Sequence, residues 1–129
     1  MTREEFIAIL DEKDYSYEIE GDKIVVTEEG DVDLYSLKTI PTDVVFNNGG
    51  YVALSLLQTI PPGVELKNGG EVYLNLLKTI PPGVEFNNGG HVFLNLVKIT
   101  GLLRKWNGNI EGIDTNRLLS FMISKEMFT

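Results

Sequence analysis

The chain has 129 residues, no cysteine, 43% hydrophobic residues and a formal net charge of −8 at pH 7. This length fits one domain with its own core, and the lack of cysteine excludes a disulfide framework and thiolate chemistry. The negative charge argues against binding to a nucleic acid backbone, and no hydrophobic run approaches the roughly 18 residues that a membrane helix needs.

Acidic residues gather at the N-terminal end of the chain. Residues 1–33 contain twelve Asp or Glu and three Lys or Arg, a net charge of −9, whereas the remainder carries +1. We interpret this end as a solvated acidic cap that keeps the protein soluble, with a docking face for a basic partner or a mimic of nucleic acid as the alternatives. The first residues lack the basic and hydrophobic regions of a secretory signal, so we expect a cytoplasmic protein.

Residues 1–29 predict a helix followed by a β-hairpin. The opening Thr-Arg-Glu-Glu has the spacing of a capping box, and hydrophobic residues follow at helical spacing, so we expect an amphipathic helix over residues 3–12. Residues 15–19 and 23–27 alternate between polar and hydrophobic side chains on either side of a Gly-Asp turn, which is typical of a hairpin. Together these elements would form the N-terminal cap that a repeat protein requires.

A 20-residue unit repeats over residues 30–107. Two almost complete copies begin at Gly49 and Gly69, with the sequences GGYVALSLLQTIPPGVELKN and GGEVYLNLLKTIPPGVEFNN; a shorter copy begins at Gly89 and a divergent one at Gly30. A fixed period of this length indicates a solenoid, in which each repeat buries its hydrophobic face against its neighbours. Equivalent positions of successive repeats would then become neighbours in space.

Each repeat predicts two short strands. The first strands are Val-x-Leu sequences at residues 32–34, 52–54, 72–74 and 92–94, and the second strands lie at residues 44–46, 64–66 and 84–86. Because side chains alternate along a strand, the first and third positions would face inward and the middle position outward. Val45, the middle residue of the strand at residues 44–46, would therefore face outward. A further inward layer would come from isoleucines that precede a proline: Ile40, Ile60 and Ile80.

Two kinds of corner would join the strands. Pro-Gly at residues 62–63 and 82–83 suits a type II turn, in which glycine takes a positive φ, whereas Asp43 replaces this glycine in the first repeat and would give another type of turn. The other corner is Asn-Gly-Gly, and strand alternation places its asparagine on the inner side. We expect these side chains to form a structural ladder that bonds the backbone of adjacent repeats: Asn48, Asn68 and Asn88.

The repeat weakens toward the C-terminus. Trp106 stands where the next copy would place the equivalent of Phe86, so the period persists although the proline corner is lost. Residues 108–129 predict a helix, hydrophobic on one side, that would lie across the last repeat as a C-terminal cap. The sequence therefore predicts a single, mainly β domain: a short right-handed β-solenoid of 20-residue coils, with a helix-hairpin cap at the N-terminus and a helical cap at the C-terminus.

The phrase Leu-x-x-Ile-Pro-Pro-Gly-Val, together with the Val-x-Leu strands, resembles bacterial leucine-rich repeats over about residues 30–107. One position departs from that family, which has an asparagine three residues after the strand where this chain has Leu37, Leu57, Leu77 and Val97. The layout also resembles small repeat proteins of unknown function from phages and environmental bacteria. Leucine-rich repeats usually bind proteins, so the resemblance implies recognition of a protein partner.

Stacking would bring aromatic side chains together on the outer face of the first strands. The middle position of successive strands is Asp33, Ala53, Tyr73 and Phe93, and the position just before them is Asp31, Tyr51, Glu71 and His91. Exposed aromatic side chains in one patch are candidate contact residues. We therefore predict a partner-binding strip made of Tyr35, Tyr51, Tyr73, His91 and Phe93. The alternative is that a cap, a loop or a second subunit covers these rings.

Two further groups of residues leave alternatives open. Glu71 and His91 would lie about 4.8 Å apart. The alternatives are two ligands of a metal, an acid-base pair or a surface ion pair. We expect the ion pair, because zinc sites take three or four ligands and this site offers two. Leu56, Leu76 and Leu96 would belong to the core if the chain bends there and would otherwise widen the strip. We predict no metal, no cofactor and no catalytic residue.

We interpret the chain as a non-enzymatic interaction module that presents the aromatic strip to a protein partner. The first alternative is a structural protein that forms homo-oligomers through the same strip. The second is a carbohydrate-binding solenoid, although sugar hydrolysis would need paired carboxylates and the outward acids are scattered. We expect neither a nucleic acid nor a membrane as a partner.

Overall fold

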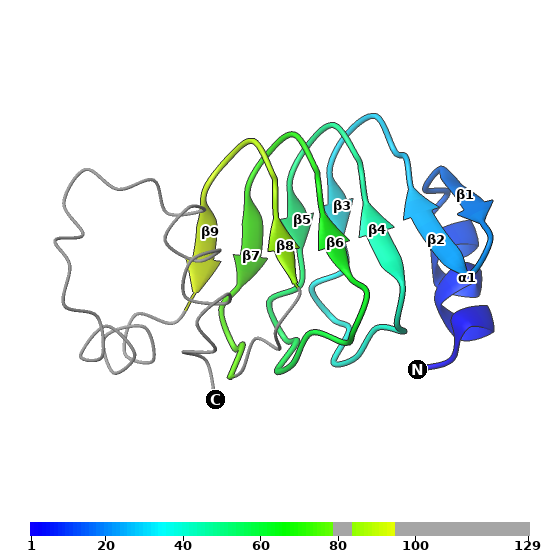
Figure 1. Cartoon of the computed structure of the whole chain (residues 1–129), viewed down its shortest axis with the longest axis horizontal. Helices are drawn as coiled ribbons and strands as arrows, with labels where there is room; N and C mark the ends of the chain where they lie inside the picture. The colour runs from blue at the N-terminus through cyan, green and yellow to red at the C-terminus, as the bar shows by residue number, and fades with distance from the viewer. Residues whose placement is uncertain (79–83, 95–129) are drawn as a thin grey trace, which may run out of the picture.

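The computed structural model describes residues 1–78 and 84–94, which form one helix and two β-sheets (Figure 1). Helix α1 spans Arg3–Glu12, and β1 (Tyr17–Glu20) and β2 (Lys23–Val26) form an antiparallel hairpin. The repeats contribute β3 (Val32–Asp33), β4 (Val44–Phe46), β5 (Val52–Ala53), β6 (Glu65–Leu66), β7 (Val72–Leu74), β8 (Glu85–Phe86) and β9 (Val92–Leu94). One sheet has five strands in the order β1-β2-β4-β6-β8, and the other has four in the order β3-β5-β7-β9. The prediction of a mainly β chain with an N-terminal helix is confirmed.

Helix α1 begins with a complete capping box. The Thr2 hydroxyl accepts a hydrogen bond from the Glu5 amide (3.1 Å), and the Glu5 carboxylate accepts one from the Thr2 amide (3.3 Å). Phe6 and Leu10, one helical turn apart, are fully buried and join the same hydrophobic cluster as Ile24 of β2. The helix and the hairpin therefore cover the N-terminal end of the core (Figure 1).

Each repeat adds one parallel strand to each sheet, and equivalent positions of successive repeats pair with each other. In the four-stranded sheet Val52 pairs with Val72 and Val72 pairs with Val92, and in the five-stranded sheet Val45 pairs with Glu65. The hairpin joins the five-stranded sheet through parallel pairing of β2 with β4. The expectation that equivalent positions become neighbours is confirmed for these strands.

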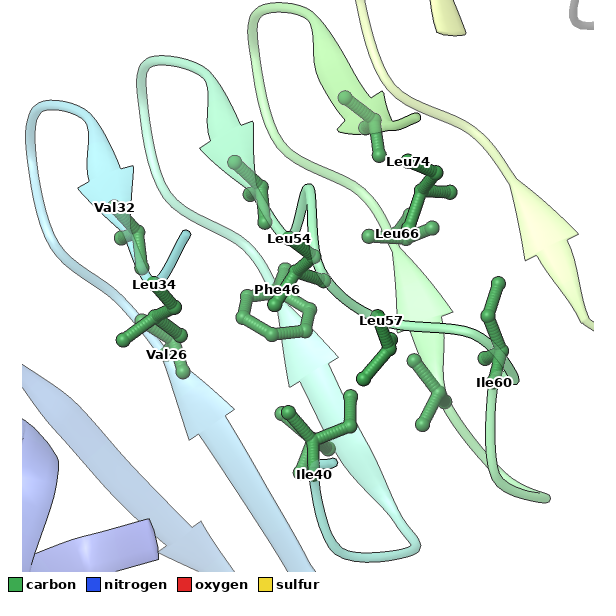
Figure 2. Packing of buried hydrophobic residues seen from close by; sticks show 14 of the residues in the cluster. Val26, Val32, Leu34, Ile40, Phe46, Leu54, Leu57, Ile60, Leu66 and Leu74 are labelled. Carbon is green, nitrogen blue, oxygen red and sulfur yellow. The ribbon is translucent and has the colours of Figure 1, made fainter. Parts of the chain in front are cut away.

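The hydrophobic core lies between the two sheets, where side chains from facing strands meet (Figure 2). The first and third positions of the predicted strands face inward and are almost completely buried: Val32, Leu34, Val44, Phe46, Val52, Leu54, Val64, Leu66, Val72, Leu74, Val84, Phe86 and Val92. Ile40 and Ile60 form the predicted further layer, each 3% exposed. Leu57 and Leu77, at the position where leucine-rich repeats have asparagine, are also core residues.

The structure describes the proline corner in two repeats, and in both of them one residue has a positive φ. Gly63 has a φ of 77°, as that position of a type II turn requires. Asp43, the equivalent residue of the first repeat, has a φ of 60°. Asp43 therefore keeps the positive φ of the glycine that it replaces, because aspartate is one of the few residues that tolerate the left-handed region. The expected change of turn type stays a prediction.

The corner asparagines form a buried column, with exposed fractions of 3% for Asn48, 1% for Asn68 and 7% for Asn88. The Asn68 side-chain amide donates to the Gly50 carbonyl of the preceding repeat (3.1 Å) and to two carbonyls of its own corner (3.1 and 3.0 Å). The other two asparagines make equivalent bonds. The amide group must point its nitrogen this way, because an oxygen facing three carbonyl oxygens would be repelled.

The glycines of the same corner leave no room for a side chain. A Cβ at Gly69 would overlap the carbonyl oxygen of Gly49 and lie 3.2 Å from its carbonyl carbon, and a Cβ at Gly70 would lie 2.9 Å from the Gly50 carbonyl carbon. The Gly70 amide donates to the Gly50 carbonyl at 3.1 Å. None of these glycines has a positive φ, so the sequence needs glycine here because the backbones of successive repeats approach closely.

One position predicted to face solvent is buried. Val45 lies at an outward position of β4 but is only 6% exposed, like its neighbour Val25 (7%) on β2. The ammonium group of Lys23 on β2 reaches the Glu65 carboxylate on β6 at 3.6 Å, and Lys67 reaches the same carboxylate at 3.7 Å. Because β4 lies between β2 and β6, the ion pair of Lys23 with Glu65 spans β4, the strand that carries Val45.

Several predicted features lie outside the described residues: Ile80, Leu96, Val97, Trp106 and the C-terminal cap of residues 108–129. In the part of the chain that the structure does describe, no helix has the length and hydrophobicity needed to cross a membrane.

We predict that Gly69→Ala lowers the free energy of unfolding by about 1–3 kcal/mol, because the added methyl group overlaps the backbone of the preceding repeat. Gly30→Ala is the control, since a Cβ at Gly30 would meet no atom within 4 Å, and it should change stability by less than about 0.5 kcal/mol. Urea denaturation measures both values. Equal effects of the two substitutions would contradict the close approach.

We predict that Asn48→Ala destabilises the protein by about 1–3 kcal/mol, because the buried amide donates to three carbonyls of two successive repeats. Asn47→Ala is a matched control one residue away, since Asn47 is exposed; it should cost less than about 0.5 kcal/mol. The midpoints of urea denaturation compare the two variants. A stable Asn48→Ala protein would show that the ladder does not support the corner.

Candidate binding surface

Three aromatic side chains stand together on the outer face of the four-stranded sheet. Tyr73 on β7 pairs with Phe93 on β9, and their rings stack with centroids 5.0 Å apart and planes 8° apart. The ring of Tyr51, just before β5, meets the Tyr73 ring at 5.6 Å and 86°, an edge-to-face contact. Phe93 is 42% exposed, and the two tyrosines are half-buried. We call Tyr51, Tyr73 and Phe93 the aromatic strip.

A small residue on β5 keeps the strip continuous. Ala53 occupies the middle position of β5, pairs with Asp33 on one side and with Tyr73 on the other, and is only 8% exposed although it faces outward. Its methyl group fills little space, so the Tyr51 ring lies close enough to contact Tyr73. A larger side chain at this position would separate the two rings.

His91 joins the strip beside Phe93. The two rings are 6.3 Å apart with 67° between their planes. Glu71 is the neighbour of His91 in the sheet register, but no ion pair joins these two described side chains, so the expected surface ion pair is wrong. The imidazole is placed against the Phe93 ring instead. No group of three or more potential metal ligands occurs among the described residues.

Tyr15 lies beside the N-terminal end of the four-stranded sheet, a position that the sequence did not predict; its side chain is half-buried and packs against the core. Its hydroxyl accepts a hydrogen bond from the Asp33 amide (3.0 Å), so it lies along the free edge of β3. The Tyr15 amide donates to the Leu10 carbonyl at 2.9 Å, which ties this position to the end of α1. The segment between the helix and the hairpin does not follow the period of the repeats, so the sequence offers no register from which its neighbours follow.

Two carboxylates lie at the N-terminal end of the strip. The Asp31 carboxylate accepts a hydrogen bond from the Tyr51 amide (2.9 Å), and the Asp33 carboxylate accepts one from the Tyr35 amide (3.2 Å). The pKa of Tyr51 is raised above its ordinary value of 10.0, first because its phenol is partly withdrawn from water and then because Asp33, Asp31 and two other phenol groups lie nearby. The Tyr51 phenol therefore lies in a negative electrostatic environment.

Tyr35 and Leu76 are two further exposed hydrophobic side chains. Tyr35 is 60% exposed and has no ring contact with another aromatic residue in the described parts of the chain. It is the exception among the five residues predicted for the surface. Leu76 is 43% exposed and therefore does not belong to the core, while its equivalent Leu56 is half-buried.

Comparison of the chain with protein family models, curated proteins and solved structures gave no match. The outer face of the four-stranded parallel sheet combines contacting aromatic rings, one imidazole and two carboxylates.

We predict that Tyr51 ionises at a higher pH in the folded protein than in the urea-unfolded chain, because its folded pKa is raised. Below pH 10 the phenol is protonated in both states; as the pH rises further the unfolded chain ionises first, so the free energy of unfolding falls through the folded pKa. Tyrosinate absorbance of the wild type minus that of Tyr51→Phe measures the titration. Asp33→Asn should lower this pKa, and an unchanged titration would contradict the proximity of the carboxylate.

Proposed function

We propose that the chain is a non-enzymatic protein-interaction module and that the aromatic strip is its contact surface. The observation that supports this function is the contact of Tyr51, Tyr73 and Phe93 with one another on an outer sheet face, with Phe93 42% exposed. Aromatic rings bring a large contact area for little conformational entropy, and they are enriched at binding hot spots. Contacts between the rings restrict them before a partner binds, which lowers the entropy lost on binding.

We also infer that the repeats wind into a right-handed β-solenoid similar to leucine-rich repeats. The support is parallel pairing in both sheets at a constant register, in which each strand residue pairs with its equivalent in the next repeat. Successive strands of one sheet are connected through a strand of the other, and crossovers between parallel strands are right-handed in about 98% of cases. Such a fold leaves the outer strand positions free to vary over a constant core, as recognition requires.

The ring geometry favours a protein partner over a carbohydrate. A sugar ring stacks on an open aromatic face, whereas Tyr73 and Phe93 direct a face toward each other, with their planes 8° apart. The carboxylates near the strip, Asp31 and Asp33, each accept a backbone hydrogen bond. A peptide suits this mixture of rings and hydrogen-bond acceptors, because its backbone amides donate hydrogen bonds and its side chains contact the rings.

Substitution of the strip tests the proposal. Tyr73→Ser/Phe93→Ser should abolish partner binding and lower the free energy of unfolding by no more than about 1.5 kcal/mol, because ring contacts at an exposed surface are lost. Asn47→Ser/Lys67→Ser changes two exposed residues of the other sheet and should bind as the wild type does. Quantitative affinity capture from the source cell compares the three proteins as baits. Identical sets of bound proteins would reject the strip, and a large loss of stability would show that the rings belong to the core.

Self-association through the strip gives a different result in solution. An interaction module should have a mass near 14.4 kDa at every concentration in size-exclusion chromatography with light scattering. A mass that rises with concentration in the wild type, but not in Tyr73→Ser/Phe93→Ser, would support an assembly protein instead.

A further inference from the structure

The aromatic strip has a charged end and a hydrophobic end. Asp31 and Asp33 lie beside Tyr51 at the end nearest the N-terminal cap, whereas Phe93 lies at the other end. We propose that the charged end binds an arginine or lysine side chain of a basic peptide segment in the partner protein. This inference rests on the proposed function and adds the chemistry of the partner.

Hydrogen bonds to the backbone hold the groups at the charged end in place. The Asp31 carboxylate is bound to the Tyr51 amide, and the Tyr15 hydroxyl is bound to the Asp33 amide. Tyr51 itself is held by the ring of Tyr73. A cation over an aromatic ring and next to a carboxylate gains from the negative face of the ring and from a charge-assisted hydrogen bond. Both kinds of group are present here and are ordered before a ligand arrives.

The carboxylates at this end have no basic counterpart among the described residues. The ion pairs among the described residues join Lys23 and Lys67 to Glu65, which lies on the five-stranded sheet. Asp33 and Asp31 also raise the pKa of Tyr51, after the larger effect of withdrawing its phenol from water, which places both carboxylates near the phenol. Residues 1–33 carry a net charge of −9, which adds a long-range field that accelerates the approach of a basic partner.

A second copy of the chain fits the charged end less well than a basic peptide does. Each copy carries a net charge of −8. A symmetric contact between two strips would place Asp31 and Asp33 opposite either the same carboxylates or the hydrophobic end of the other strip, and neither supplies a cation. A peptide can instead place a guanidinium or ammonium group on Tyr51 and a hydrophobic side chain toward Phe93. The strip would then select a segment in which basic and hydrophobic residues alternate.

A pair of peptides tests the role of the positive charge. The first is a hexapeptide of alternating arginine and leucine with acetylated and amidated ends, and the second carries citrulline, the neutral analogue of arginine, at the same positions. We expect the arginine peptide to shift nitrogen–proton NMR signals of residues 31–33, 51–53 and 71–73 in a saturable manner. The citrulline peptide should bind at least about tenfold more weakly, because it lacks the charge.

Matched charge variants locate the binding site. Asp31→Asn/Asp33→Asn keeps the side-chain oxygens that accept backbone hydrogen bonds but removes two charges, and it should weaken the arginine peptide about tenfold. Glu18→Gln/Glu20→Gln removes the same charge from exposed residues of β1 in the other sheet and should weaken binding less than about twofold. Urea denaturation verifies that both variants are folded.

The outcomes separate this inference from the proposed function. Equal binding of both peptides at the strip would overturn the cationic site and leave a peptide-binding strip in place. Equal losses in the two charge variants would overturn the site in favour of diffuse attraction to an acidic protein. No shift with either peptide would overturn the cationic site, whereas the proposed function is tested separately, by partner capture, stability and solution mass of Tyr73→Ser/Phe93→Ser.

Discussion

The close backbone contact between equivalent Asn-Gly-Gly corners is the constraint on which the rest of the structure depends. Here Gly69 approaches Gly49 too closely for a side chain, and the Asn68 amide binds carbonyls of two successive repeats. Both contacts recur at the same place in the three corners that begin at Asn48, Asn68 and Asn88, so an inserted residue would remove both at once. Strands of the five-stranded sheet end just before this corner and strands of the four-stranded sheet begin just after it. One contact therefore fixes the register of both sheets.

That constraint separates the positions that must stay constant from those that are free to vary. Apart from the corner asparagines, the inward columns of the repeats hold only valine, leucine, isoleucine or phenylalanine, because each side chain packs against its equivalent in the next repeat. The outward column of the four-stranded sheet changes from Asp33 through Ala53 and Tyr73 to Phe93. The surface therefore changes from acidic to aromatic along the direction in which the repeats stack, while the backbone beneath it stays the same. The outward residues therefore change from repeat to repeat without a change in the packing of the core.

The periodic part of the structure could be predicted from the sequence, and most of the departures lie where the period gives no information. Strand positions, inward side chains and the contact of Tyr51 with Tyr73 all follow from the constant length of the repeat. Tyr15 could not be placed because the segment between α1 and the hairpin has no equivalent in a repeat. Val45 is buried where β4 pairs with β2 of the hairpin, which is again a contact between the cap and the repeats. The outward position of Leu76 depends on the path of a corner, which alternation along strands does not determine.

The two outer faces differ in how they treat charge, and this difference favours one of them as the binding surface. On the five-stranded sheet, Glu65 is shared by Lys23 and Lys67, and the outward valines Val25 and Val45 are buried. On the four-stranded sheet, carboxylates stand beside aromatic rings, and in the described residues no lysine or arginine forms an ion pair with them. On the first face the central carboxylate is balanced by lysines, and the outward valines expose little surface. The second leaves negative charge and ring surface together, a combination that a stable fold does not require and that a cationic, partly hydrophobic partner complements.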